Sequence, residues 1–405
     1  MAKMNGVLME ANRRQAFTNL NVKTDKRLIL CLDGGGMRGI LTIQLLKKLE
    51  EIAGIPCYEL FDMVSGTSTG GIIAALIVMG YTAPQIEDKY IQLISDVFDK
   101  RTFGDRFMNP PKFSKSKFRK LVKDEVQDIT LNESCAKKNL DLMILAHDLT
   151  AAEETFFTCF KQKDVSYYGT YKYVLLRAVM EATMSAPTYF NPLERFIDGG
   201  TTTYNNPALS AYIEAISYSF PIGNENKSEY EVSKMCIFSF GTGISRKFIK
   251  PQQTIKVPGL DIKFWLEWIM MQTGQDASAM QVNALRSPII NKIIDFRRFQ
   301  ISLDQTSMKK IPNIDTLDPK KYKSKWLHDL DENVLKNIDM ADITRFDLMK
   351  IIGEQMAKYI VLEGKAFTKD LVNEKNNDLL ITMSGDIDRI KKQMSDANWL
   401  DNFED

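Results

Sequence analysis

A serine with glycines two positions before and after it is the pattern in this chain with the clearest chemical meaning. Gly66, Ser68 and Gly70 follow a short apolar run, and an apolar helical pattern over 72–79 comes directly after them. Where a strand turns sharply into a helix, the seryl hydroxyl stands exposed on the turn, and glycine at the flanking positions avoids a Cβ clash. The first turn of the helix also supplies unpaired N–H groups that suit a developing oxyanion. Ser68 is therefore a candidate nucleophile.

A glycine-rich turn follows the first strongly apolar segment. That segment, 27–33, has the nearly continuous apolar character of a strand buried on both faces. Gly34, Gly36 and Gly39 come next, at the spacing of a dinucleotide-binding loop. The acidic residue that such a loop needs about 20 positions further on, at the end of a second strand, is missing from the sequence. The loop could instead direct backbone N–H groups at a carbonyl oxygen. The serine motif favours that use, with a nucleotide-binding oxidoreductase as the alternative.

Composition limits the choice of a base for Ser68, because the chain has only two histidines. His147 follows a predicted strand, where a histidine is more often a structural hydrogen-bond partner, and His328 lies in a lysine-rich, irregular stretch. Asp198 lies between a short predicted strand and two glycines. An aspartate in that position commonly forms only a turn, but here it is the better candidate base. Two histidines also exclude a three-histidine metal centre.

Three stretches taken together resemble the signatures of the patatin-like phospholipases. They are residues 33–39 (DGGGMRG), 66–71 (GTSTGG) and 198–200 (DGG). The connecting stretches 182–190, 205–208 and 239–243 also resemble that family, and the resemblance covers residues 26–245 closely and continues more weakly to about 365. Met184 and Ser185 stand where the family often has two small residues, which would narrow the acyl pocket.

The resemblance implies a serine acyl hydrolase, or phospholipase A, that cleaves fatty-acyl esters of glycerophospholipids without a metal or organic cofactor. Ser68 would be the nucleophile and Asp198 the general base of a Ser–Asp dyad. The remaining implied site residues are the oxyanion-hole residues Gly34, Gly35, Gly36 and Arg38, the nucleophile-elbow residues Gly66 and Gly70, and the proton-acceptor residues Gly199 and Gly200. A carboxylate with an ordinary pKa of about 3.9 is a weak base for a hydroxyl unless desolvation raises that pKa. A catalytically silent lipid-binding module is the second alternative.

Strands that alternate with helices predict a three-layer α/β/α fold with a mostly parallel central sheet and a helical C-terminal part. Strands are predicted at 27–33, 139–147, 154–160, 195–197 and 235–240, and helices at 40–52, 72–79, 82–100, 177–186 and 344–364. Asp33, Ser68, Asp198 and Gly241 then share the carboxyl edge of the sheet, where ligands bind in such folds. We expect a polar leader (1–26), a catalytic core (27–245), a helix-rich part of the same domain (246–365) and a candidate regulatory tail (366–405).

The overall composition is that of an ordinary globular protein. The 405 residues are 44% hydrophobic and 26% charged, and the net charge of +1 argues against nucleic acid as the main partner. Five scattered cysteines, a polar amino terminus and apolar runs much shorter than the ~20 residues of a membrane span predict a cytoplasmic protein. The expected partner is a phospholipid or other lipid ester at a membrane surface, with peripheral association when active. A small-molecule or protein activator and a homo-oligomer stay open.

Two outer segments allow two interpretations each. The basic stretch 112–123 could contact anionic lipid headgroups, although a solvated helix face is the more common use of such a pattern. The segment 260–271, which is apolar almost all round, could enter a membrane interface or line an acyl channel, or be a buried core helix. A further amphipathic segment is expected at 386–398.

Overall fold

The computed structural model describes residues 2–98, 113–159, 171–219, 231–245, 262–309, 311, 317–362, 367 and 395–398. Within them a seven-stranded sheet has the order β4-β3-β2-β1-β6-β7, with β5 paired to β3. The strands are β1 (Arg27–Leu32), β2 (Met63–Thr67), β3 (Asp141–Asp148), β4 (Glu153–Cys159), β5 (Phe196–Asp198), β6 (Met235–Phe240) and β7 (Asp295–Phe299). All neighbours pair in parallel except β3 with β4 and β3 with β5, so the expected mostly parallel sheet is confirmed.

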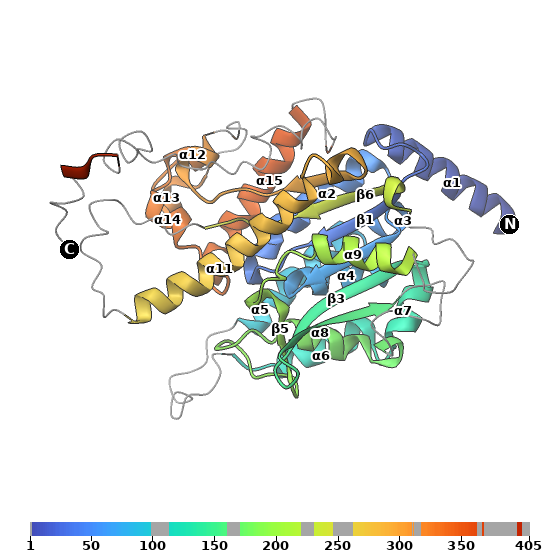
Figure 1. Ribbon diagram of the computed structural model, residues 1–405, viewed down its shortest axis with the longest axis horizontal. Coiled ribbons are helices and arrows are strands. Elements are labelled where there is room, and N and C mark those ends of the chain that lie inside the picture. Colours follow the sequence, from blue (N-terminus) through green and yellow to red (C-terminus); the bar gives the residue numbers. More distant parts are fainter. Residues whose placement is uncertain are drawn as a thin grey trace.

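Helices cover both faces of this sheet (Figure 1). The α-helices of the described residues are α1 (Ala2–Asn19), α2 (Gly39–Ala53), α3 (Cys57–Leu60), α4 (Thr69–Val78), α5 (Ala83–Val97), α6 (Ser116–Val126), α7 (Leu131–Lys138), α8 (Leu176–Thr183), α9 (Ala208–Ser219), α11 (Ile262–Leu285), α12 (Gln305–Met308), α13 (Pro319–Tyr322), α14 (Glu332–Lys336) and α15 (Phe346–Leu362). Short 3-10 helices are η1 (Gly36–Arg38), η3 (Tyr171–Tyr173), η4 (Gly199–Thr201), η5 (Val232–Lys234), η6 (Ile290–Lys292), η7 (Leu327–Asp329) and η8 (Ile343–Arg345).

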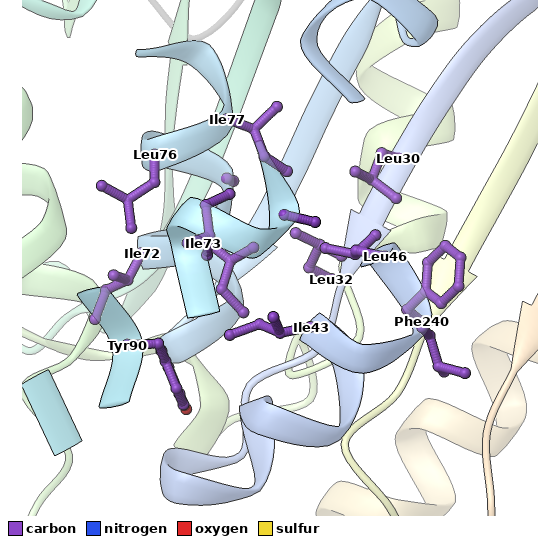
Figure 2. Close-up of a cluster of buried hydrophobic side chains, with 14 of the residues drawn as sticks. Leu30, Leu32, Ile43, Leu46, Ile72, Ile73, Leu76, Ile77, Tyr90 and Phe240 are labelled. Atoms are coloured by element: carbon purple, nitrogen blue, oxygen red, sulfur yellow. The ribbon is translucent and has the colours of Figure 1, made fainter. Parts of the chain in front are cut away.

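The apolar run of β1 explains the three layers. Successive side chains of a strand point to opposite faces, so Leu30 and Leu32 belong to one core and Ile29 and Cys31 to the other. The first core contains side chains of α2, α4, α5, α8 and α15, and Figure 2 shows Leu30 and Leu32 among those of α2 and α4. The second contains side chains of α9 and α11. Because both faces of the sheet are covered, its charged residues must be paired or functional.

The predicted polar leader, residues 1–26, contains a helix. Residues 2–19 form α1, which contacts α2 and α3. In its final turn and just after it, Ala16, Phe17 and Leu20 are buried in the core. Asn19 Nδ2 also donates to the Ile52 carbonyl at 2.9 Å. So short an apolar stretch leaves no helical period in the sequence, and tertiary packing holds the helix in place.

The part 246–365 was expected to be helix-rich, and it also contains the edge strand β7. This strand reads Asp-Phe-Arg-Arg-Phe, and its charges hide the apolar pattern of a buried strand. Arg297 pairs with Asp295 at 2.8 Å, and Arg298 reaches across the sheet to Asp33. Fully buried arginines are rare without such pairing, so sequence periodicity alone favours the wrong interpretation.

The sequence singled out three further segments, and the structure describes them only in part. The basic stretch enters α6, and the segment 260–271 enters α11, while the side chains of 262–273 lie outside the described residues. Most of the tail 366–405, including most of the predicted helix 386–398, also lies outside them. None of the helices that the structure describes is long and apolar enough to cross a membrane.

Candidate active site

The carboxyl ends of β1 and β2 lie side by side and deliver the glycine loop and Ser68 to the same edge of the sheet. Leu32 pairs in parallel with Gly66, so Gly34 and Ser68 each lie two residues beyond this register position. Asp198 reaches the same place from β5, where it pairs with Ala146 of β3. The structure therefore brings together three segments that are far apart in the sequence.

Ser68 occupies a strained turn between β2 and α4. Its backbone has φ 53° and ψ −126°, a conformation that non-glycine residues rarely adopt. The chain is packed closely at this turn: a Cβ on Gly70 would lie 2.7 Å from the Asp33 carbonyl oxygen. The Ser68 N–H donates to Thr183 Oγ1 at 2.8 Å, which fixes the turn against the end of α8. This arrangement has the geometry of a nucleophile elbow.

Ser68 and Asp198 form a direct hydrogen bond. Ser68 Oγ lies 2.5 Å from Asp198 Oδ2, and both residues are at least 93% buried. The Gly200 N–H donates to the other carboxyl oxygen at 2.7 Å, and the Asp198 N–H donates to the Ser185 carbonyl at 3.1 Å. The carboxyl group is thus held from two sides and faces the hydroxyl.

The burial of Asp198 changes its acid–base character. Burial raises the pKa of Asp198 to about 7, and the negative charge of Glu154 also raises it, while the hydrogen bonds from Ser68 and Gly200 lower it. A carboxylate with a pKa near the ambient pH accepts a proton much better than an ordinary aspartate. The environment therefore supplies the desolvation that a carboxylate base needs.

The glycine loop presents two backbone donors. The Gly34 N–H donates to the Asn205 carbonyl at 3.3 Å, and Thr242 Oγ1 donates to the Gly34 carbonyl at 2.9 Å. The Gly35 and Gly36 N–H groups have no hydrogen-bond acceptor within the described part of the chain. Gly36 has φ +56°, a backbone conformation that favours glycine. Of these two glycines, Gly36 lines the same cavity as Ser68.

Arg38 and Asp33 hold the two ends of this loop. Arg38 Nε donates to the Gly35 carbonyl at 3.4 Å. Arg298 Nη1 donates to Asp33 Oδ1 at 2.7 Å and to Ser239 Oγ at 2.8 Å, and its second nitrogen bonds the other carboxyl oxygen of Asp33. Sequence reasoning missed Arg298, because it lies 265 positions from Asp33 in a segment predicted to be helical.

A narrow apolar cavity adjoins Ser68 and Asp198. Its volume of about 30 Å³ is room for one or two water molecules. Its walls include Leu93, Phe98, Met184, Tyr189, Phe190 and Met340. Met184 lines the cavity, and its expected effect of narrowing an acyl pocket stays a prediction. The cavity volume is far below the roughly 300 Å³ or more of an ordinary small-molecule site.

Met340 closes this cavity from the C-terminal part of the chain. Its carbonyl accepts the Met37 N–H at 2.7 Å, and a Cβ on Gly36 would lie 2.8 Å from the Met340 Cβ. The neighbouring Asp339 accepts a hydrogen bond of 3.3 Å from the hydroxyl of Tyr189, which lines the cavity. The 339–340 segment therefore bridges the glycine loop and the opposite wall.

The other sequence candidates lie elsewhere. His147 Nδ1 is 3.3 Å from Glu154 Oε1, and His328 is 3.2 Å from Asp329; neither histidine lines the cavity. Near the start of the basic stretch, Lys115 is buried, with its Nζ 2.6 Å from Ser185 Oγ. Among the residues with described positions, no three His, Cys, Asp or Glu side chains lie close enough to hold a metal ion.

Comparison with known proteins agrees with this geometry. Residues 30–212 match the family model described as patatin-like phospholipase. The chain is 29% identical over 248 residues to the 85/88 kDa calcium-independent phospholipase A2 of Mus musculus. This alignment covers 58% of this chain and 30% of that protein. It is 28% identical over 232 residues to the cGAMP-activated phospholipase of Escherichia coli strain TW11681, covering 53% and 61%. The cUMP-AMP-activated phospholipase of Escherichia coli is 41% identical over 98 residues, covering 24% and 31%. The chain thus spans less than two thirds of each of these relatives.

Proposed function

We propose that this chain is a lipid acyl hydrolase that cleaves fatty-acyl esters of glycerophospholipids with a Ser–Asp dyad. The observation that carries the proposal is the 2.5 Å contact between Ser68 Oγ and Asp198 Oδ2 at a strained strand-to-helix turn. The apolar cavity beside this pair and the match of residues 30–212 to the patatin-like phospholipase family model support a lipid ester as substrate.

In the proposed reaction Asp198 accepts the Ser68 proton as Oγ attacks the ester carbonyl. The Gly35 and Gly36 N–H groups stabilise the resulting oxyanion, whereas the Gly34 N–H already donates to Asn205. Asp198 then returns the proton to the departing alcohol oxygen, which leaves an acyl group on Ser68. Water attacks this acyl-enzyme with Asp198 again as the base, and the fatty acid is released.

The surroundings of the glycine loop argue against the nucleotide-binding alternative. A Cβ on Gly34 would lie 2.5 Å from Asn205 Oδ1 and 2.9 Å from the Ser68 Cβ. On the other side, Gly36 lies against Met340. These glycines allow close approach of protein to protein, whereas a dinucleotide loop needs space for a pyrophosphate.

The test is release of free fatty acid from phospholipid vesicles. Wild-type protein should release it, and the Ser68→Ala and Asp198→Asn proteins should not, with folding unchanged by circular dichroism. Ser114→Ala, at an exposed serine, is the matched control and should keep full activity. Full activity of the Ser68→Ala protein would refute the proposal. Wild-type protein that stays inactive with every activator tried would favour the silent lipid-binding module.

A small-molecule activator is the second part of the proposal. The printed names of two relatives describe them as activated by cGAMP and by cUMP-AMP. The closed cavity supports a requirement for a prior opening step. Adding each cyclic dinucleotide to the vesicle assay tests this part, and equal rates with and without both would contradict it. The homo-oligomer, the cytoplasmic location and peripheral membrane association stay predictions.

A further inference from the structure

A second hollow lies at the edge of the sheet opposite Ser68. Its volume is about 420 Å³, within the range of small-molecule sites. We call it the basic hollow, defined by five cationic residues that line it: Arg13, Arg14, Lys26, Arg27 and Lys234. They come from α1, from the start of β1 and from the turn before β6. A neighbouring hollow of about 380 Å³ shares the Arg14 wall.

The outer cations of the basic hollow are held only weakly. Three carboxylates, Glu10, Asp25 and Glu231, share the lining with the five cations, which leaves a net of two positive charges. Arg14 pairs with Glu10 at 2.5 Å, and Lys234 pairs with Glu231 at 3.2 Å. The side chains of both pairs are 40% exposed or more, and such pairs contribute little. A stronger anion could therefore replace these carboxylates.

The inner cations share one carboxylate. Arg13 and Arg27 lie 2.5 and 3.3 Å from the oxygens of the buried Asp62, which also accepts the Leu28 N–H at 2.9 Å. Counting Asp62, the cluster still has one more cation than carboxylates. Within the described part of the chain, Arg13 Nε is buried and has no hydrogen-bond partner. The Phe17 ring lies 5.2 Å below the Arg13 guanidinium and helps to fix it in place.

We infer that the basic hollow binds a small, soluble, phosphate-bearing ligand. Converging guanidinium groups match the geometry and charge of phosphate oxygens. β1 has six residues between the hollow and the glycine loop, which places the two sites about 20 Å apart at opposite edges of the sheet. A bilayer that presents an ester to Ser68 would not reach the hollow. This choice of a free ligand over a headgroup of the substrate membrane rests on the proposed function, whereas the inference that the hollow binds phosphate oxygens does not.

The test measures the binding of inorganic pyrophosphate by calorimetry at low ionic strength. The wild-type and Ser68→Ala proteins should bind it equally. Replacing Arg14 and Lys234 together by glutamine should weaken binding by about tenfold or more, the effect expected when charge-assisted hydrogen bonds are removed. Glu10→Gln removes a competing carboxylate and should strengthen binding by about two- to fivefold. The matched control is Arg177→Gln, because Arg177 is also an exposed arginine with one exposed carboxylate partner; its affinity should be unchanged.

A parallel arm measures sedimentation with phosphatidylglycerol vesicles. Pyrophosphate binding that responds to the variants as described, with no change in vesicle binding, supports the inference. Absence of pyrophosphate binding to the wild-type protein overturns it, as does equal binding by all variants. Vesicle binding that the Arg14 and Lys234 changes abolish, without pyrophosphate binding, overturns it in favour of a membrane-facing surface. Since the Ser68→Ala protein is measured too, failure of the hydrolase proposal would leave these results interpretable.

Discussion

Asp198 and Glu214 are two carboxyl groups in similar surroundings with different consequences. Both are at least 95% buried, and burial raises the pKa of each to about 7. Asp198 has a seryl hydroxyl on one oxygen and a backbone N–H on the other. Glu214, on α9, has no hydrogen-bond partner on either oxygen among the residues described. The comparison shows that burial sets the affinity for a proton, whereas the partners decide whether the carboxylate can take part in chemistry.

The position of Glu214 explains why ionisation of its carboxyl group is unfavourable. Ala211 and Ala215 of α9 belong to the core on the second face of the sheet. Ser210, one turn before Glu214, is buried as well, and its hydroxyl has no partner in the described part of the chain. Ionisation of Glu214 therefore places a charge among apolar groups, where nothing offsets the loss of hydration. Ionisation of Asp198 places a charge beside a hydroxyl that donates a hydrogen bond to it.

The largest effect should come from Asp198→Asn. Loss of the base should reduce fatty-acid release by about 10³-fold or more, as for other catalytic dyads and triads. The same change removes a buried charge, so the free energy of unfolding above pH 7 should rise. Activity on phospholipid vesicles and chemical denaturation check the two parts. A variant that is inactive but also less stable than wild type would contradict this account of Asp198.

The pH dependence of activity should follow Asp198. Only its ionised form accepts the Ser68 proton, so kcat/KM should fall about tenfold per pH unit below about 7 and be level above it. An ordinary aspartate would give a midpoint near 4. The Glu214→Gln protein should show the same midpoint as wild type. A shifted midpoint in that variant would mean that the pH profile reports Glu214 and not Asp198.

Glu214→Gln should change stability and leave activity unchanged. The pKa of Glu214 is raised in the folded protein, so folding favours its protonated form. Its contribution to stability is therefore fully present below the unfolded pKa near 4.5 and is lost as the pH rises to about 7. At about pH 8 the variant should be more stable than wild type by about 1–2 kcal/mol. Unfolding in urea across pH 5 to 8 measures this, and an equal pH slope in both proteins would contradict it.

The sequence predicts one side of this comparison well and the other poorly. Ser68 and Asp198 lie in short motifs at strand ends, because the turn requires glycines that are visible in the sequence. The layers follow from the apolar run of β1, whose residues must be buried on both faces. Glu214 lies in an ordinary helix, and nothing in its neighbourhood reveals that it is buried. Arg298 and Met340 act across more than 260 positions of sequence, where no local pattern records the contact.

Met340→Ala tests whether the Met340 side chain excludes water from the Asp198 carboxyl group. The Met340 side chain lines the narrow cavity. Truncating this side chain should widen the cavity and let water approach Ser68 and Asp198. Long-chain esters should then react with a kcat/KM raised by about two- to fivefold, and the midpoint of the pH profile should move to lower pH. Met280→Ala, at a methionine 67% exposed on α11, is the matched control. A lower rate for long-chain esters would instead make Met340 part of the binding surface.

The smallest effect should come from Glu154→Gln. The negative charge of Glu154 helps to raise the pKa of Asp198, and its removal should move the midpoint of the pH profile slightly to lower pH. Glu153→Gln is the matched control, because Glu153 is the neighbouring residue on β4 and is exposed. Since burial is the larger cause of the shift at Asp198, most of the displacement from an ordinary aspartate should persist in the Glu154→Gln protein. A midpoint that returns to near 4 would mean that charge repulsion, and not burial, makes Asp198 a base.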